Sequence, residues 1–264
     1  MLRTPNTELR TENFSIDEIF SRWPLTDPNA KKILFRGEGV GTVSSYGAGW
    51  MAGKGIDVVV LDGANRFDPY KVSLFAKKAL MLRQRQTPSP SFGTGAPLSI
   101  NPEPPGFRPE EVEGLISPVI LLKRIQIARA FTCYQMVTLI GEKLASLLDA
   151  LQKPWVILMG PVTPFLDEDV PEREVRPLFE KVLKKMESMA MAGVPFFLFQ
   201  PPDFIHSKRS YLGKRLFQFS DLVLRIDLDG EEPKMILEKI ADSKWLIGDI
   251  KNQVVVAPPF TGGE

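Results

Sequence analysis

ILFRGEGVGTVSSYGAGWMAGKGIDVVVLDGANRFD, residues 33–68, alternates short apolar runs with glycine-rich turns. Ile33 to Phe35 predict a buried strand, Ile56 to Leu61 predict a second one, and the segment around Trp50 between them is expected to be a helix. Three glycines at alternate positions separate the first strand from this helix: Gly37, Gly39 and Gly41. A turn of this kind can direct backbone N–H groups at a phosphate. The stretch therefore predicts an α/β protein and a first candidate ligand site.

The turn keeps only part of the P-loop pattern, in which a glycine is followed by four residues and then by Gly-Lys-Ser/Thr. Counted from Gly37, the second glycine falls on Thr42, the lysine on Val43 and the hydroxyl residue on Ser44, with Ser45 next. The turn and a hydroxyl are thus retained, and the phosphate-binding lysine is not. Taken alone, this pattern fits a tight turn without any ligand as well as a nucleotide site.

Further segments of the chain resemble the RecA/RadA family of recombination ATPases, including its RadB-like and KaiC-like branches. Residues 61–69, LDGANRFDP, are similar to the second core strand and its exit, and residues 124–135 to the next strand and the start of its helix. Residues 154–163, PWVILMGPVT, occupy the place of the Walker B strand. Residues 195–200, PFFLFQ, occupy the place of the strand that ends in the family's glutamine sensor of the γ-phosphate, here Gln200.

The resemblance covers roughly residues 15–240 and implies a RecA-like α/β fold. We expect a mostly parallel, twisted sheet with helices on both faces and an antiparallel edge at the C-terminal end. The whole chain, residues 1–264, is predicted to form a single domain. Residues 1–14 are expected to be a loose N-terminal segment. Residues 86–109, rich in proline, serine and glycine, are expected to form a flexible insertion that is either a solvated linker or a partner-binding arm.

The departures from the family concern its catalytic groups. Val43 stands where a lysine contacts the β- and γ-phosphates, Gly160 where an acid ends the Walker B strand, and Ala64 where a glutamate polarises the attacking water. Phosphoryl transfer depends on positioned charge around the phosphate and its metal ion. The resemblance therefore implies the fold and argues against ATP hydrolysis. The nucleotide-binding positions are expected to be vestigial, with no required cofactor and weak or absent binding of ATP and magnesium.

Composition excludes several classes of protein. The formal net charge is +1, so no global field draws the chain to nucleic acid or anionic lipid. Cys133 and His206 are the sole cysteine and histidine, which excludes an internal disulfide and His-rich or Cys-rich metal sites. No apolar run approaches the roughly 20 residues of a membrane span, and the N-terminal residues are polar. The sequence predicts a cytoplasmic protein that does not enter a membrane.

Apolar spacing predicts the remaining elements. Helices are expected near residues 15–20, 70–83, 109–113, 134–151 and 173–192, and parallel strands at 121–128, 155–159 and 196–199. Three short strands are expected at the C-terminal edge, over residues 221–227, 235–239 and 253–257. The acidic run 167–169 is either a hard-cation site or, as we expect, a solvated loop that opens a helix. Gln200 is either the family's sensor or a simple strand-end residue. The two prolines that follow it are expected to stiffen the connection to the next loop.

The family's main DNA-contacting loop corresponds to residues 203–215, DFIHSKRSYLGKR. It carries four cations against one acid, with aromatic side chains between them. Charge for the backbone and rings for the bases are what single-strand binding uses, although basic solvated loops are common. The candidate DNA-binding residues are Lys208, Arg209, Tyr211, Lys214 and Arg215.

The sequence therefore predicts a catalytically inactive RecA-like accessory protein in DNA repair or recombination. It would act by binding a protein partner, single-stranded DNA or both. Two alternatives remain open at this stage. One is an ATPase with an atypical P-loop completed by a partner, and the other is a nucleotide sensor that binds without hydrolysis.

Overall fold

The computed structural model describes residues 31–76, 121–151, 154–229, 232–240 and 254–256. Eight strands of the described part form one sheet in the order β3-β2-β4-β5-β1-β6-β7-β8. The strands are β1 Lys32–Gly37, β2 Val58–Asp62, β3 Ile125–Arg129, β4 Trp155–Met159, β5 Phe196–Gln200, β6 Leu222–Asp229, β7 Glu232–Ile240 and β8 Val254–Val256. All pairs from β3 to β6 are parallel, and β6–β7 and β7–β8 are antiparallel. The predicted mostly parallel α/β fold with an antiparallel C-terminal edge is confirmed.

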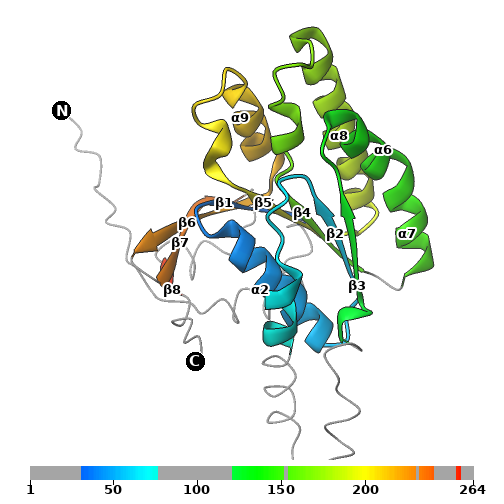
Figure 1. Cartoon of the computed structure of the whole chain (residues 1–264), viewed down its shortest axis with the longest axis vertical. Coiled ribbons are helices and arrows are strands. Elements are labelled where there is room, and N and C mark those ends of the chain that lie inside the picture. Colours follow the sequence, from blue (N-terminus) through cyan, green and yellow to red (C-terminus); the bar gives the residue numbers. More distant parts are fainter. Residues whose placement is uncertain (1–30, 77–120, 152–153, 230–231, 241–253, 257–264) are drawn as a thin grey trace, which may run out of the picture.

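Helices cover both faces of this sheet, as Figure 1 shows. They are α2 Val40–Gly53, α6 Cys133–Thr138, a π-helical turn η1 Leu139–Lys143, α7 Leu144–Ala150, α8 Glu172–Met191 and α9 Ser210–Phe219, with short 3₁₀ turns η2 Thr163–Phe165 and η3 Pro202–Phe204. Residues 69–76 are helical as well. Helix α2 and residues 72–75 pack on one face, and α6, α7, α8 and α9 on the other.

The central strands are apolar on both faces because helices cover both. Neighbouring residues of a strand point to opposite sides, so Phe35 packs in the α2 layer and Leu34 in the α8 layer. Every residue of β2, β4 and β5 is buried. Continuous apolar runs of this kind are typical of buried parallel strands, which is why the sequence predicted β4 and β5 correctly.

Two expectations need correction, and four others fall outside the described residues. The strand expected over 121–128 begins only at Ile125, because residues 121–122 are still helical and a turn follows. Residues 203–215, expected to form a loop, contain η3 and the first half of α9. The loose segment 1–14, the helix near 15–20, the insertion 86–109 and the helix near 109–113 all lie outside the described residues.

The sheet has a topological switch point between β1 and β5. These neighbours send their following helices to opposite faces, since α2 follows β1 in one layer and α9 follows β5 in the other. In open α/β sheets, ligands bind in the crevice beyond the carboxyl ends of the strands at such a point. The residues after β1 and β5 are therefore the place to look for a site.

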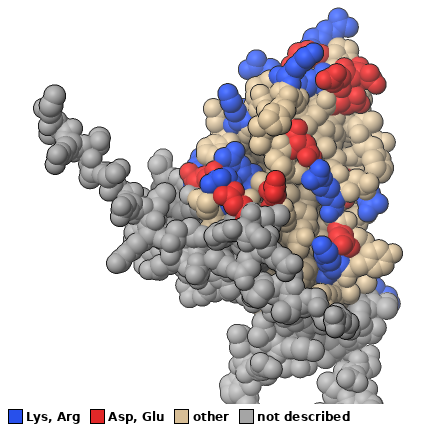
Figure 2. Space-filling model, turned by 60° about the vertical axis from the view of Figure 1, so that its left-hand side comes forward, with Lys and Arg blue, Asp and Glu red and all other residues tan. Residues whose placement is uncertain are grey.

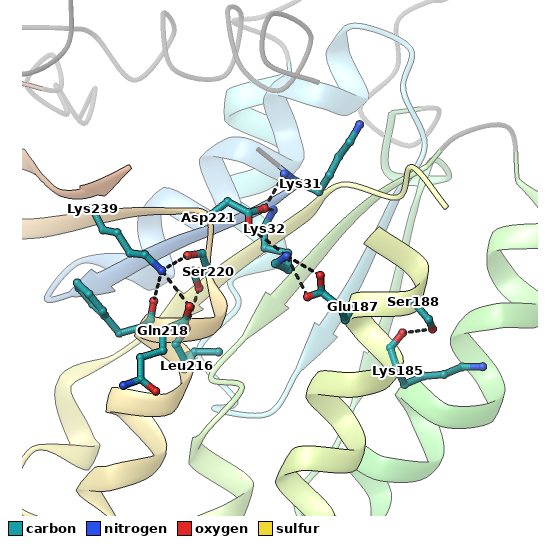
Figure 3. A network of polar contacts seen from close by, with 11 residues as sticks. Lys31, Lys32, Lys185, Glu187, Ser188, Leu216, Gln218, Ser220, Asp221 and Lys239 are labelled. Atoms are coloured by element: carbon teal, nitrogen blue, oxygen red, sulfur yellow. Dashed lines mark hydrogen bonds and ion pairs between the residues drawn. The ribbon is translucent and has the colours of Figure 1, made fainter. Parts of the chain in front are cut away.

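At the opposite end of β1, the side chain of Lys32 joins α8 to the start of β6 (Figure 3). Its Nζ lies 2.9 Å from Glu187 and 3.0 Å from Asp221. The same Asp221 accepts 2.9 Å hydrogen bonds from the backbone N–H groups of Lys31 and Lys32. Burial works against the charged amine, but the hydrogen bonds to Glu187 and Asp221 outweigh it and raise the pKa of Lys32.

Candidate functional site

The connection between β1 and α2 consists of two residues, Glu38 and Gly39. Gly39 has a φ of 75° and its carbonyl accepts hydrogen bonds from the N–H groups of Thr42 and Val43. Gly37 has a φ of 112°, and a Cβ there would lie 2.2 Å from the Ile226 carbonyl oxygen. Positive φ and close backbone approach both require glycine. The glycines of this turn thus have packing roles that involve no ligand.

The side chains that follow the turn are directed into the protein. Val43 is 1% exposed and belongs to the core beneath α2. The hydroxyls of Ser44 and Ser45 donate to the Gly41 carbonyl at 2.8 and 3.0 Å. Ser45 Oγ also accepts the backbone N–H of Asp68 at 3.1 Å. Both serines are buried, so the hydroxyl retained from the P-loop pattern, Ser44, is engaged within its own helix.

One lysine reaches this region from another element, and the sequence analysis did not identify it. Lys71 lies in the helical segment 69–76 and its Nζ donates to Thr42 Oγ1 at 3.3 Å. Thr42 is in the first turn of α2, where the helix dipole favours anions. A search of the sequence for a lysine beside the turn could not have found Lys71, because 28 intervening residues separate it from Thr42.

The end of β4 has no room for a carboxylate. Gly160 has a φ of 63°, and a Cβ at this position would lie 2.4 Å from the Ala64 Cβ. Its N–H donates to the Phe199 carbonyl at 2.7 Å, which holds the backbone against β5. An acid here would have to overcome both the left-handed conformation and the overlap with Ala64.

Asp62, at the end of β2, is the one buried carboxylate of the described part of the chain. Its Oδ1 accepts the N–H groups of Ala64 and Arg66 at 3.2 and 3.3 Å, and its Oδ2 accepts that of Phe67 at 3.2 Å. Arg129 lies 3.7 Å away. The carboxylate therefore organises the loop after β2 and has little capacity left for a metal ion.

Gln200 connects β5 with the loop after β4. Its Oε1 accepts the Val162 N–H at 2.9 Å and its Nε2 donates to the Pro201 carbonyl at 2.9 Å. The side chain is 1% exposed. Both ends of the amide are occupied, as expected for a residue that fixes the end of a strand.

Arg209 is the most deeply embedded of the candidate DNA-binding residues. It is 7% exposed, and its guanidinium donates to the carbonyls of Phe165 and Val170 at 3.0 and 2.5 Å. It also donates to the Asp167 carbonyl, and its Nε lies 2.9 Å from Glu172. Arg209 therefore joins α9 to the loop before α8, which removes it from the set of side chains free to meet a phosphate.

Two further candidates pair with acids of α8. Arg215 makes two hydrogen bonds to Glu180, at 2.7 and 3.0 Å. The Tyr211 hydroxyl donates to Glu172 at 2.6 Å. Burial, together with this bond, raises the pKa of Tyr211 to about 12. The hydrogen bond from Tyr211, with Arg209 second, lowers the pKa of Glu172.

Lys208 and Lys214 are the exposed cations that remain in the predicted loop. Neither forms a hydrogen bond or ion pair with another described residue. Phe204, one of the aromatic side chains of this segment, packs on α9: a Cβ added at Gly213 would lie 2.1 Å from its ring. The structure thus divides the predicted DNA site into two free lysines and three side chains with internal partners.

The acidic run 167–169 is exposed and forms a turn in which Asp167 accepts the Asp169 N–H at 3.1 Å. Across the described residues, no group of three His, Cys, Asp or Glu side chains is arranged to hold a metal ion. The same part of the chain contains no helix with the length and apolar character needed to cross a bilayer.

A cavity of about 520 Å³ opens at the switch point. Arg36 and Arg225 form its charged side, and both pair with Glu238, at 2.6 and 3.3 Å. Arg225 also pairs with Asp227 at 3.0 Å. The other lining residues are Gly37, Glu38, Pro202, Phe204, Ile205 and Ile226. Since acids already pair with both arginines, an anionic ligand would have to compete with them.

A comparison with protein-family models finds no match for this chain, and a search of curated proteins finds none either. The functional argument therefore rests on the geometry described above.

Proposed function

We propose that this chain is a catalytically inactive RecA-like accessory protein of DNA repair or recombination, located in the cytoplasm, that acts by binding another protein. The observation that carries the proposal is the closed position at Gly160. Its φ of 63° and the 2.4 Å approach to Ala64 leave no space for the acid that would hold a magnesium-bound water.

The β1–α2 turn supports the same conclusion. Val43 is buried where a P-loop protein has its lysine, and Ser44 bonds back to Gly41. ATP hydrolysis needs the lysine, the metal and the polarising base together. A fold that keeps the parallel sheet and its switch point, but fills these positions with packing residues, is suited to binding and not to phosphoryl transfer.

The surface favours a protein partner over nucleic acid. On the face that Figure 2 shows, positively and negatively charged side chains of the described residues are interspersed, and neither sign forms an extended patch. Within the 203–215 segment, Arg209, Tyr211 and Arg215 are held by Glu172 and Glu180. Single-stranded DNA remains the second candidate partner, through Lys208 and Lys214.

Nucleotide binding without hydrolysis is a second candidate function, favoured by one contact. Lys71 donates to Thr42 at the first turn of α2, so a cation and a helix N-terminus lie together. A γ-phosphate would have to use this lysine in place of the one that Val43 replaces.

The test uses the full-length protein. We expect no ATP turnover with magnesium, with or without single-stranded DNA, and no change in Tm on addition of ATP–Mg. Turnover that disappears in Ser44→Ala would overturn the proposal. A Tm increase abolished by Lys71→Ala, without turnover, would favour the second candidate. To test for a partner, the protein is immobilised and should retain the purified RecA-type recombinase of its host. Binding to neither this recombinase nor single-stranded DNA would contradict the proposal.

A further inference from the structure

A second cavity, of about 410 Å³, lies between η1 and α8, away from the switch point. Its lining residues are Val137, Gly141, Lys181, Val182, Lys184, Lys185 and Ser188. The α6–η1–α7 helix passes through a π-helical turn here, and Gly141 is in that turn. A Cβ added at Gly141 would meet no atom within 4 Å. The space over the helix is therefore open, and π-turns are found frequently at functional sites.

Three lysines of one helix face border this groove. Lys181, Lys184 and Lys185 make no ion pair with another described residue, and Ser188 completes the row one turn further on. Residues three and four apart lie on the same side of a helix. Figure 3 shows the Lys185 side chain extending away from Glu187, on the other side of α8. The groove thus collects positive charge from a single rigid element.

The four acids of α8 do not neutralise these lysines, because each of the acids binds a residue of another element. Glu172 binds Arg209 and Tyr211, and Glu180 binds Arg215. The other two acids are engaged as well: Glu174 accepts the Tyr134 hydroxyl at 2.6 Å, and Glu187 pairs with Lys32 at 2.9 Å. Glu142 and Lys143, which follow Gly141 in the π-turn, carry opposite charges. Among the described residues that line the groove, the charged ones are the three lysines.

We propose that this groove, defined by Gly141 and the lysines 181, 184 and 185, binds an acidic peptide segment of a partner protein. The proposal deepens the proposed function and rests on it, since it assigns the partner surface. Val137 and Val182 give the groove an apolar floor, so the segment should carry an apolar side chain between its acids. None of the lining residues is aromatic, and single-strand binding relies on rings that stack with bases. Charge complementarity and an apolar floor together favour a peptide.

The test is a fluorescence-anisotropy titration of the full-length protein with a labelled peptide that has two glutamates on each side of a Leu-Leu pair. The wild type should bind it, and binding should weaken as salt is added. The variant K181Q/K184Q/K185Q should bind about tenfold more weakly, because each lysine contributes a modest charge contact. Gly141→Leu should also weaken binding, since a Cβ at this position meets no atom within 4 Å and the side chain would enter the groove.

The matched controls separate this site from general charge. K208Q/K214Q removes two exposed lysines, one just before α9 and one within it, and should leave peptide affinity unchanged within about twofold. A peptide with glutamines in place of the glutamates should bind more weakly than the acidic one. An unlabelled oligothymidylate should not displace the labelled peptide.

Three results would overturn the proposal: no binding by the wild type, equal binding by the triple lysine variant, or displacement of the peptide by the oligonucleotide. Each of these leaves the ATP and recombinase tests of the proposed function unaffected. ATP turnover, in contrast, would overturn the proposed function and would leave the peptide result standing.

Discussion

Arg209, just before α9, and Glu172 at the start of α8 lie 2.9 Å apart, and the same guanidinium donates to backbone carbonyls of the segment before α8. The contact joins the segment after β5 to the segment after β4. It makes Arg209 a structural residue, although the sequence analysis predicted a DNA-contacting loop for this segment.

Arg209→Ala should reduce the free energy of unfolding by about 2–4 kcal/mol. The substitution leaves buried carbonyls of Phe165 and Val170 without their donor, which costs more than the loss of an exposed contact. Arg209→Lys should recover only part of the loss, because an ammonium cannot reproduce the planar fork. The measurement is urea denaturation followed by circular dichroism.

Lys208→Ala is the matched control for Arg209→Ala. It removes an exposed neighbouring cation and should change stability by no more than about 0.5 kcal/mol. Equal destabilisation by the two variants would show that Arg209 does not hold α9 in place.

The closed position at Gly160 predicts a difference between two glycines of positive φ. Gly193→Ala should cost about 1–2 kcal/mol, because its φ of 97° is strained but no atom lies within 4 Å of the new Cβ. Gly160→Ala has the same type of backbone strain and also overlaps Ala64, so about 1–3 kcal/mol more is expected. Denaturant midpoints of the two variants, compared with the wild type, measure this difference.

Ala64→Gly is the rescue for this prediction. Combined with Gly160→Ala, it removes the nearest atom that the new methyl group strikes. It should recover part of the added cost, because Thr163 Oγ1 at 2.8 Å and the backbone nitrogen of residue 64 at 2.9 Å remain. Similar losses for the Gly160 and Gly193 variants would mean that the end of β4 has room for a side chain.

The Tyr211–Glu172 hydrogen bond predicts a loss of stability in alkaline solution. The pKa of Tyr211 is about 12 in the folded protein, above the ordinary value of about 10. Between these values the folded chain binds the phenol proton more tightly than the unfolded chain does. The contribution of Tyr211 to the free energy of unfolding is therefore complete below pH 10 and is lost as the pH rises toward 12.

The variant Tyr211→Phe isolates this effect from the other alkaline titrations. Lys32 also has a raised pKa, and its contribution is lost in the alkaline range in both proteins. The difference in unfolding free energy between wild type and Tyr211→Phe should shrink from pH 9.5 to pH 12. A constant difference over that range would contradict the assignment.

The sequence predicted the helices and strands whose apolar pattern is local. It did not predict side-chain contacts between residues that are distant in the chain. Five consecutive apolar residues identified β4, and apolar spacing identified the helix over 134–151, because burial on a helix or strand repeats along the chain. The π-turn at Gly141 was not predicted, since one added residue hardly changes that spacing. The acids Glu172 and Glu180 lie 37 and 35 residues from the arginines they bind. For this reason the sequence analysis predicted a free loop for the basic segment 203–215.

Helix α9 itself had a signal that the prediction did not use. Leu212, Leu216 and Phe219 recur at steps of four and three residues and pack against the layer of α8. The same segment was interpreted through its charges, although Arg215 lies beside these apolar residues and binds Glu180 of α8. The assignment of Val43, Gly160 and Ala64 to replaced catalytic positions stays a prediction from the sequence. The close packing of Gly160 against Ala64 could be found only in the structure.

The geometry of α9 also revises the strength expected for any contact with single-stranded DNA. Four cations would give a log–log salt slope of about −2 to −3, whereas the two free lysines, Lys208 and Lys214, give about −1.4 at most, at roughly 0.7 per phosphate. The variant K208A/K214A should flatten the slope nearly to zero in an anisotropy titration with a labelled oligonucleotide. Arg215→Ala should leave it unchanged, because the guanidinium already binds Glu180 through two hydrogen bonds. A wild-type slope steeper than −2, reduced by Arg215→Ala, would mean that this pair opens when DNA binds.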